Sequence, residues 1–125
     1  MPGKHALVAD EPGYAGGTDT GAAPIDLMAA SLASCKAVTL RMQADRHGWP
    51  LEGATVEVVH RRVSARSLGE ASRGCVDLME CEIELEGDAL TVQQRQRLLK
   101  LSANCWVQHA LERPVRVASR LAGEA

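Results

Sequence analysis

The chain has 125 residues, enough for one domain with a buried core, and we expect a single domain over residues 1–125. Apolar residues make up 46% of the chain and charged residues 24%, a balance that excludes a disordered chain. The net charge of -2 gives no basic surface for nucleic acid, and no apolar run reaches the ~20 residues of a membrane span, so neither partner is expected.

The first part of the chain predicts a strand, a loop and a long helix. Residues 5–9 are short and apolar, which is typical of a strand, and the Gly-rich residues 10–24 predict a loop. Pro24 and Asp26 suit the first turn of a helix that Gly48 ends, and Ala and Ser residues around its centre predict a buried central helix. The residues expected to form its inward face are Leu27, Ser31 or Leu32, Cys35, Val38 and Met42.

The second part of the chain predicts a hairpin, two helical segments and a last strand. Residues 54–63 and 75–86 alternate in character and favour two strands with one wet face, joined by a turn over 64–74. Thr91 and Gln94 fit a capping box that begins a helix through about Ala103, and a short helical turn should follow before Pro114. Residues 115–121 alternate again and predict a closing strand. Strands in hairpins with two helices segregated from them describe an α+β domain with an antiparallel sheet.

The four cysteines are expected to be thiols. The N-terminal residues lack the pattern of a secretory signal, so we expect a cytoplasmic, reducing location. Cys75 and Cys81 lie six residues apart on one predicted strand, about 20 Å, which is too far for a disulfide. Cys81 shares its phase with Ile83 and Leu85 and is predicted to be a small core residue, whereas Cys75 borders the turn. The Cys and His spacings match no structural zinc motif, so no metal is expected.

Cys35 and Cys105 have different surroundings, because each lies in or beside a helix among small or polar residues. Cys105 follows a predicted helix end, where the amides of the next turn would stabilise a thiolate. Cys35 lies too deep in its helix for that effect and needs a cation or hydrogen bonds. Asp26, two and a half turns earlier, is better placed to organise a loop or a cation than to act as a base. The residues alone leave open a reactive pair or two thiols that only pack a core.

Two long stretches carry a resemblance to a known family. They are ADEPGYAGGTDTGAAPIDLMAASLASCKAVTLRMQADRHGWPL at residues 9–51 and IELEGDALTVQQRQRLLKLSANC at 83–105. At these residues the chain resembles the OsmC/Ohr family of osmotically inducible and organic hydroperoxide resistance proteins, and the likeness covers nearly the whole chain. The resemblance implies an intertwined α+β homodimer whose strands wrap two central helices, with active sites at the dimer interface.

The resemblance also implies roles for individual residues. Cys35 would be the peroxidatic thiol, Cys105 the resolving thiol and Asp26 the supporting carboxylate. A thiolate attacks the O–O bond of a small hydroperoxide and becomes a sulfenic acid, which condenses with the second thiol to a disulfide. No cofactor is expected, but an external dithiol must reduce that disulfide.

Three departures from the family pattern give a second hypothesis. The family has an activating Arg on an N-terminal strand, but this chain has no Arg before Arg41, and the resemblance implies that its N-terminal strands are shortened. Lys4, His5 or a partner subunit would have to supply the cation. Trp106 and Gln108 also stand where this branch has a Pro-Val-His sequence. The alternative is therefore a weakly active or non-catalytic dimer that binds a small apolar ligand or senses redox state.

Overall fold

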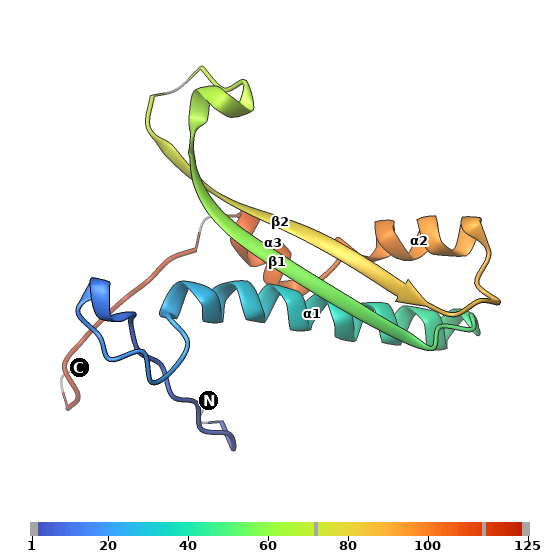
Figure 1. Cartoon of the computed structure of the whole chain (residues 1–125), viewed down its shortest axis with the longest axis horizontal. Coiled ribbons are helices and arrows are strands. Elements are labelled where there is room, and N and C mark those ends of the chain that lie inside the picture. The colour runs from blue at the N-terminus through green and yellow to red at the C-terminus, as the bar shows by residue number, and fades with distance from the viewer. Residues whose placement is uncertain (1–2, 72, 114, 124–125) are drawn as a thin grey trace.

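A long helix and a long hairpin dominate the computed structural model, which describes residues 3–71, 73–113 and 115–123 (Figure 1). Within these residues the α-helices and strands are α1 (Pro24–His47), β1 (Gly53–Ser64), β2 (Cys75–Glu86), α2 (Val92–Ser102) and α3 (Trp106–Glu112). Short 3-10 turns, η1 (Gly13–Ala15) and η2 (Ala65–Leu68), precede α1 and cap the hairpin. The predicted α+β class is confirmed.

The ends of α1 are those that the sequence predicts. Pro24 is in the first turn, where its missing N–H is not needed, and Asp26 adds a negative charge near the helix N-terminus. Gly48 ends the helix in a left-handed conformation with φ of 69°, and its N–H donates to the carbonyl groups of Ala44 and Asp45.

The predicted inward face of α1 was correct at Leu32, which is buried, but wrong at Val38 and Met42. The buried positions of the helix are Ala29, Leu32, Lys36, Leu40 and Ala44. Val38 and Met42, which were expected inside, are 58% and 57% exposed. The helix contacts β1, α2 and α3, and its buried residues form the side that packs against the rest of the chain. Both faces of α1 carry apolar side chains, so periodicity could not decide which of them the chain covers.

β1 and β2 form the predicted antiparallel hairpin, with a register from Gly53 opposite Glu86 to Ser64 opposite Cys75. Directly opposed residues share a face of the sheet, so Val56 and Ile83 lie on one face and acidic residues such as Glu82 on the other. The alternating burial along both strands confirms one packed face and one wet face.

The core lies at one end of the molecule. It consists of Leu40, Ala44, Leu51, Leu90 and Leu98, which come from the second half of α1, the connections on either side of the hairpin, and α2. In Figure 1 the tip of the hairpin curls away from the first half of α1. This half of the helix, which carries Cys35, therefore has less covering from its own chain.

Two predicted strands are not strands in the single chain. Residues 5–9 form only an isolated parallel bridge between Ala9 and Ala22, and residues 115–121 form no strand. A strand needs a neighbour for its N–H and C=O groups, and β1 and β2 pair only with each other within the described part of the chain. Apolar side chains in both segments stay open to solvent, with Val8 69% and Val117 85% exposed.

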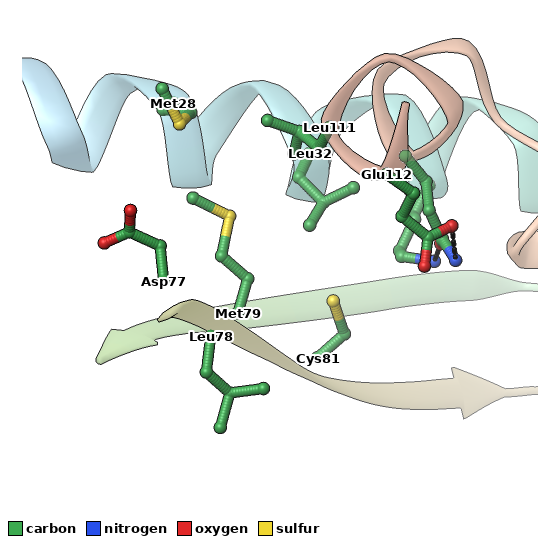
Figure 2. Close-up of a pocket in the computed structure, with 10 residues that line it drawn as sticks. Met28, Leu32, Asp77, Leu78, Met79, Cys81, Leu111 and Glu112 are labelled. Carbon is green, nitrogen blue, oxygen red and sulfur yellow. Dashed lines mark hydrogen bonds between the residues drawn. The ribbon is translucent and has the colours of Figure 1, made fainter. Parts of the chain in front are cut away.

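The expectation that Cys81 packs in the core was also wrong, because Cys81 is exposed. Its side chain does leave β2 on the side of α1, as Figure 2 shows, in phase with Met79. Hairpin and helix diverge there and leave a cavity instead of a packed core. Cys75, at the turn, is exposed as well.

Candidate active site

Cys35 lies in the middle of α1 and is partly buried. Its carbonyl oxygen accepts a hydrogen bond from the Thr39 hydroxyl at 2.8 Å, within the helix. Its side chain borders a cavity of ≈ 540 Å³ on the face of α1 that the hairpin does not cover. The other residues that line this thiol cavity are Ser31, Ser34, Val38, Thr39, Met42, Gln43, Asn104, Cys105, Trp106 and Val107.

The end of α2 and the start of α3 bring Cys105 to the same cavity. The predicted capping box is present at the start of α2: Gln94 N–H donates to the Thr91 hydroxyl at 3.1 Å, and Thr91 N–H donates to Gln94 Oε1 at 3.0 Å. Cys105 is the N-cap of α3, and its Sγ accepts a hydrogen bond from the Gln108 backbone N–H at 3.4 Å. Cys105 is only 2% exposed. The sequence therefore located this thiol correctly beside a helix start.

The electrostatic balance at Cys105 is opposite to the one that its helix start suggests. Burial, the largest effect, raises the pKa of the Cys105 thiol, and the neighbouring Cys35 side chain raises it further through a hydrogen bond and its charge. The Gln108 N–H and the positive charge of Lys36 act in the other direction but do not outweigh burial. Burial therefore favours the protonated form of the Cys105 thiol.

Lys36 is a buried cation that the sequence reasoning missed. It is 5% exposed, and its Nζ donates to the Ser102 carbonyl oxygen at 3.2 Å and to Gln108 Oε1. The detectable signal was its spacing of four from both Leu32 and Leu40, which places a lysine on the buried stripe of α1. The structure thus provides a positive charge next to the thiols that comes from α1 itself.

The other predicted groups are not assembled at the thiols. Asp26 is exposed in the first turn of α1 and, among the described residues, forms no side-chain hydrogen bond or ion pair. Lys4 and His5 are exposed, and neither lines the thiol cavity. Within the described ranges no group of three or more His, Cys, Asp or Glu side chains is arranged to hold a metal ion.

A second cavity of ≈ 540 Å³ lies between α1 and the inner face of the hairpin. Figure 2 shows Met28 and Leu32 on α1 facing Met79 and Cys81 on β2, while Leu78 points away on the other side of the strand. Lys36 and Gln108 also line this inner cavity. Because Gln108 contacts Cys105 as well, these two residues lie between the inner cavity and the thiol cavity.

The loop before α1 is organised by one carboxylate. Asp10 accepts five hydrogen bonds, from the N–H groups of Glu11, Thr18 and Thr20 and from both Thr hydroxyls, at 2.6–3.2 Å. The hydrogen bonds from Thr18 and Thr20 hold the pKa of Asp10 well below its ordinary value. Gly17 is required in this loop, because a side chain there would collide with the Glu11 backbone.

Comparisons with known proteins identify the family. The protein-family model described as OsmC-like protein matches residues 17–120. A search of the curated proteins found no significant match. None of the helices in the described residues has the length and apolar character needed to cross a bilayer.

Solved structures show the same fold. A protein from Psychrobacter arcticus named for osmotic stress induction and detoxification aligns with a TM-score of 0.64 at 23% identity, over 83% of this chain and 70% of that one. An organic hydroperoxide resistance protein OsmC from Legionella pneumophila aligns with a TM-score of 0.63 at 19% identity, over 84% and 72% of the two chains. A third protein, from Vibrio cholerae, is provisionally named for organic hydroperoxide resistance and has captopril bound in one of its active sites. It aligns with a TM-score of 0.62 at 20% identity, over 82% of this chain and 66% of that one. With the family-model match over most of its length, the chain belongs to the OsmC-like family.

Proposed function

We propose that this protein is a thiol-dependent hydroperoxide reductase in oxidative-stress defence, with Cys35 as the peroxidatic thiol and Cys105 as the resolving thiol. The observation that carries the proposal is that both thiols line one cavity and that the Cys35 side chain interacts with Cys105. Membership of a family that includes organic hydroperoxide resistance proteins is consistent with it.

The burial of Cys105 supports this assignment of the two roles. The Cys35 thiolate attacks one oxygen of the hydroperoxide; the O–O bond breaks, the alkoxide takes a proton and leaves as an alcohol, and Cys35 becomes a sulfenic acid. Cys105 then attacks that sulfur, the S–O bond breaks, and water and a disulfide are formed. An external dithiol takes the two oxidising equivalents and returns both cysteines to thiols. Cys105, whose pKa burial raises, is suited to the second step because it holds a proton during the first.

The cavity wall favours organic substrates. Val38, Met42 and Trp106 line the thiol cavity, and they are 58%, 57% and 89% exposed, so they offer apolar contact area. Covering alkyl surface contributes roughly 25 cal/mol per Å². An alkyl hydroperoxide should therefore be reduced more efficiently than hydrogen peroxide.

The active form is proposed to be a homodimer. The single chain exposes 9712 Å², whereas a compact monomer of its mass exposes about 6,500 Å². The difference, about 3,200 Å² per chain and about 6,400 Å² for two chains, is at least the total area that obligate dimers bury, about 2,000–5,000 Å² or more. Residues 5–9 and 115–121 would then pair as strands with the partner, and Asp26 would hold a cation or loop of the second copy.

The test of the reaction is the Cys35→Ser variant, assayed with an alkyl hydroperoxide and dithiothreitol. We expect turnover to be lost, and we expect the Cys75→Ser variant, which changes an exposed thiol at the turn, to keep it. Turnover that is equal in the two variants would refute the proposed role of Cys35.

One observation favours the alternative of a weakly active protein that binds an apolar ligand or senses redox state. No Arg lines the thiol cavity in the part of the chain that the structure describes, whereas the family pattern supplies one. Under this alternative the thiols are inert to mild hydroperoxide, and an apolar fluorescent probe binds with similar affinity to the parent chain and to Cys35→Ser.

A further inference from the structure

We propose that the buried Lys36 ammonium is the counter-ion of the Cys105 thiolate. Lys36 would thus be a positioning residue that serves the resolving half of the cycle. The inference builds on the proposed function, since it concerns the second thiol of the same pair.

The geometry connects Lys36 to Cys105 through a single residue. Gln108 accepts a hydrogen bond from Lys36 Nζ on its side-chain oxygen, and its backbone N–H donates to Cys105 Sγ at 3.4 Å. The second donation of Lys36, to the Ser102 carbonyl at 3.2 Å, fixes the ammonium against the last turn of α2. The cation therefore lies where the end of α2 and the start of α3 meet, beside the thiol that caps α3.

The charge of Lys36 is not balanced by a direct partner. Among the described residues it forms no ion pair with a carboxylate, and its two acceptors are a backbone carbonyl and an amide. A buried ammonium without a counter-ion is costly, so this site lacks one negative charge in the reduced state. Ionisation of the buried Cys105 would supply that charge.

None of the other titratable groups near Lys36 and Cys105 acts as a direct counter-ion of Lys36 in the described part of the chain. Glu112 on α3 reaches Lys36 only through Gln108, whose Nε2 donates to Glu112 Oε1 at 3.2 Å. Asp77 on β2 lines the same inner cavity but is engaged by His60 at 2.9 Å and by Arg62 at 3.4 Å. His109 on α3 contacts Asn104, and Cys35 on α1 is the other thiol of the pair.

A thiolate at Cys105 is needed twice in each cycle. It is the attacking group when the S–S bond forms, the S–O bond of the Cys35 sulfenic acid breaks, and the departing hydroxide takes a proton to become water. It is the leaving group when an external thiolate attacks the Cys35 sulfur of the disulfide and the bonding electron pair goes to Cys105. A fixed positive charge stabilises the thiolate in both steps.

The test measures the ionisation of Cys105 directly. Variants Cys35→Ser, Cys75→Ser and Cys81→Ser are combined so that Cys105 is the single thiol, and its ¹³Cβ resonance is followed against pH. We expect Lys36→Met to raise the pKa of Cys105 by about one unit. The fraction of Cys105 that is thiolate at neutral pH should then be about tenfold lower. Lys36→Arg should restore most of the parent value, and Lys100→Met, which removes an exposed lysine, should leave it unchanged. An unchanged or lower pKa in folded Lys36→Met overturns the proposal.

A second measurement needs no change at Lys36. In the same single-thiol protein, the ¹³Cε resonance of Lys36 should move at the pH at which Cys105 ionises, because the coupling of two charges is reciprocal. A Lys36 resonance that does not respond at that pH overturns the proposal even if every Lys36 variant fails to fold.

A kinetic experiment distinguishes failure of the proposed role of Lys36 from failure of the proposed peroxidase function. After one equivalent of alkyl hydroperoxide, Lys36→Met with all four cysteines should accumulate a Cys35 sulfenic acid that dimedone traps, whereas the parent proceeds to the disulfide. If the parent itself shows no oxidation, the proposed function fails while the ionisation measurement still decides the role of Lys36. If the parent forms its disulfide and Lys36→Met forms it at the same rate, the role of Lys36 fails alone.

Discussion

Cys35 and Cys105 lie 70 residues apart in the sequence and line the same cavity, one from the middle of α1 and the other from the start of α3. Their proximity predicts that mild treatment with an alkyl hydroperoxide removes two hydrogens from the protein and forms one disulfide. Intact mass spectrometry measures the loss. It should vanish in Cys35→Ser and in Cys105→Ser and persist in the Cys75→Ser, Cys81→Ser double variant. A loss that depends on Cys75 or Cys81 instead would contradict this pairing.

The pKa of Cys105 gives the resolving step a pH dependence. Burial, the first cause of its raised pKa, persists after Cys35 is oxidised, so Cys105 is protonated at neutral pH. The attacking thiolate then becomes about tenfold more abundant for each pH unit up to that pKa, and disulfide formation should accelerate in proportion. Stopped-flow measurement of the tryptophan signal between pH 7 and 9 tests this, with Cys105→Ser as the control for signals unrelated to the disulfide. A rate that is constant over this range would show that Cys105 is already ionised.

The exposed segments at the two ends of the fold predict that the chain forms a dimer in solution. We expect a particle of about twice the 13.4 kDa mass of the chain, because the apolar surface of residues 5–9 and 115–121 needs covering. Val117→Lys should weaken that assembly, whereas Val92→Lys, which changes another exposed valine in the first turn of α2, should not. Analytical ultracentrifugation separates the two results. A parent chain that sediments as a monomer at micromolar concentration would contradict the dimer.

The loop before α1 should depend on Asp10. Replacing Asp10 by Ala removes the acceptor of five hydrogen bonds, so the amides of Thr18 and Thr20 should exchange their hydrogens faster with solvent. The control is Asp19→Asn, which changes a carboxylate in the same loop and keeps a residue that tolerates the positive φ of 55° found there. Equal exchange in the parent and in Asp10→Ala would show that the loop is held by other contacts.

Local signals in the sequence were sufficient for most of the secondary structure. The capping box of Thr91 and Gln94, the stop at Gly48 and the alternation of residues 75–86 all correspond to elements with the predicted ends. These features depend on neighbours in the chain, which the sequence displays. The family, too, followed from long motifs, and the match over residues 17–120 confirms it.

The mistakes concern relations between distant parts of the chain. Residues 5–9 and 115–121 have strand-like sequences, but neither segment pairs with β1 or β2 in the described residues. The choice between the two apolar faces of α1 depends on where the hairpin packs. Lys36 was overlooked for the same reason, since its spacing of four from Leu32 and Leu40 indicates a buried lysine only if that face of α1 is the covered one.

The small core at one end of α1 predicts how stability is distributed along α2. Leu98 is fully buried in that core and its neighbour Leu99 is 49% exposed, so the two residues form a matched pair on one helix. Leu98→Ala should reduce the free energy of unfolding by about 2–5 kcal/mol, because it removes buried methyl groups and leaves a cavity beside Leu40. Leu99→Ala should cost about 0.5 kcal/mol or less, as for most surface changes. Urea titration at fixed protein concentration compares the two. Similar losses would mean that the Leu99 side of α2 is also covered, which in this fold requires a second chain.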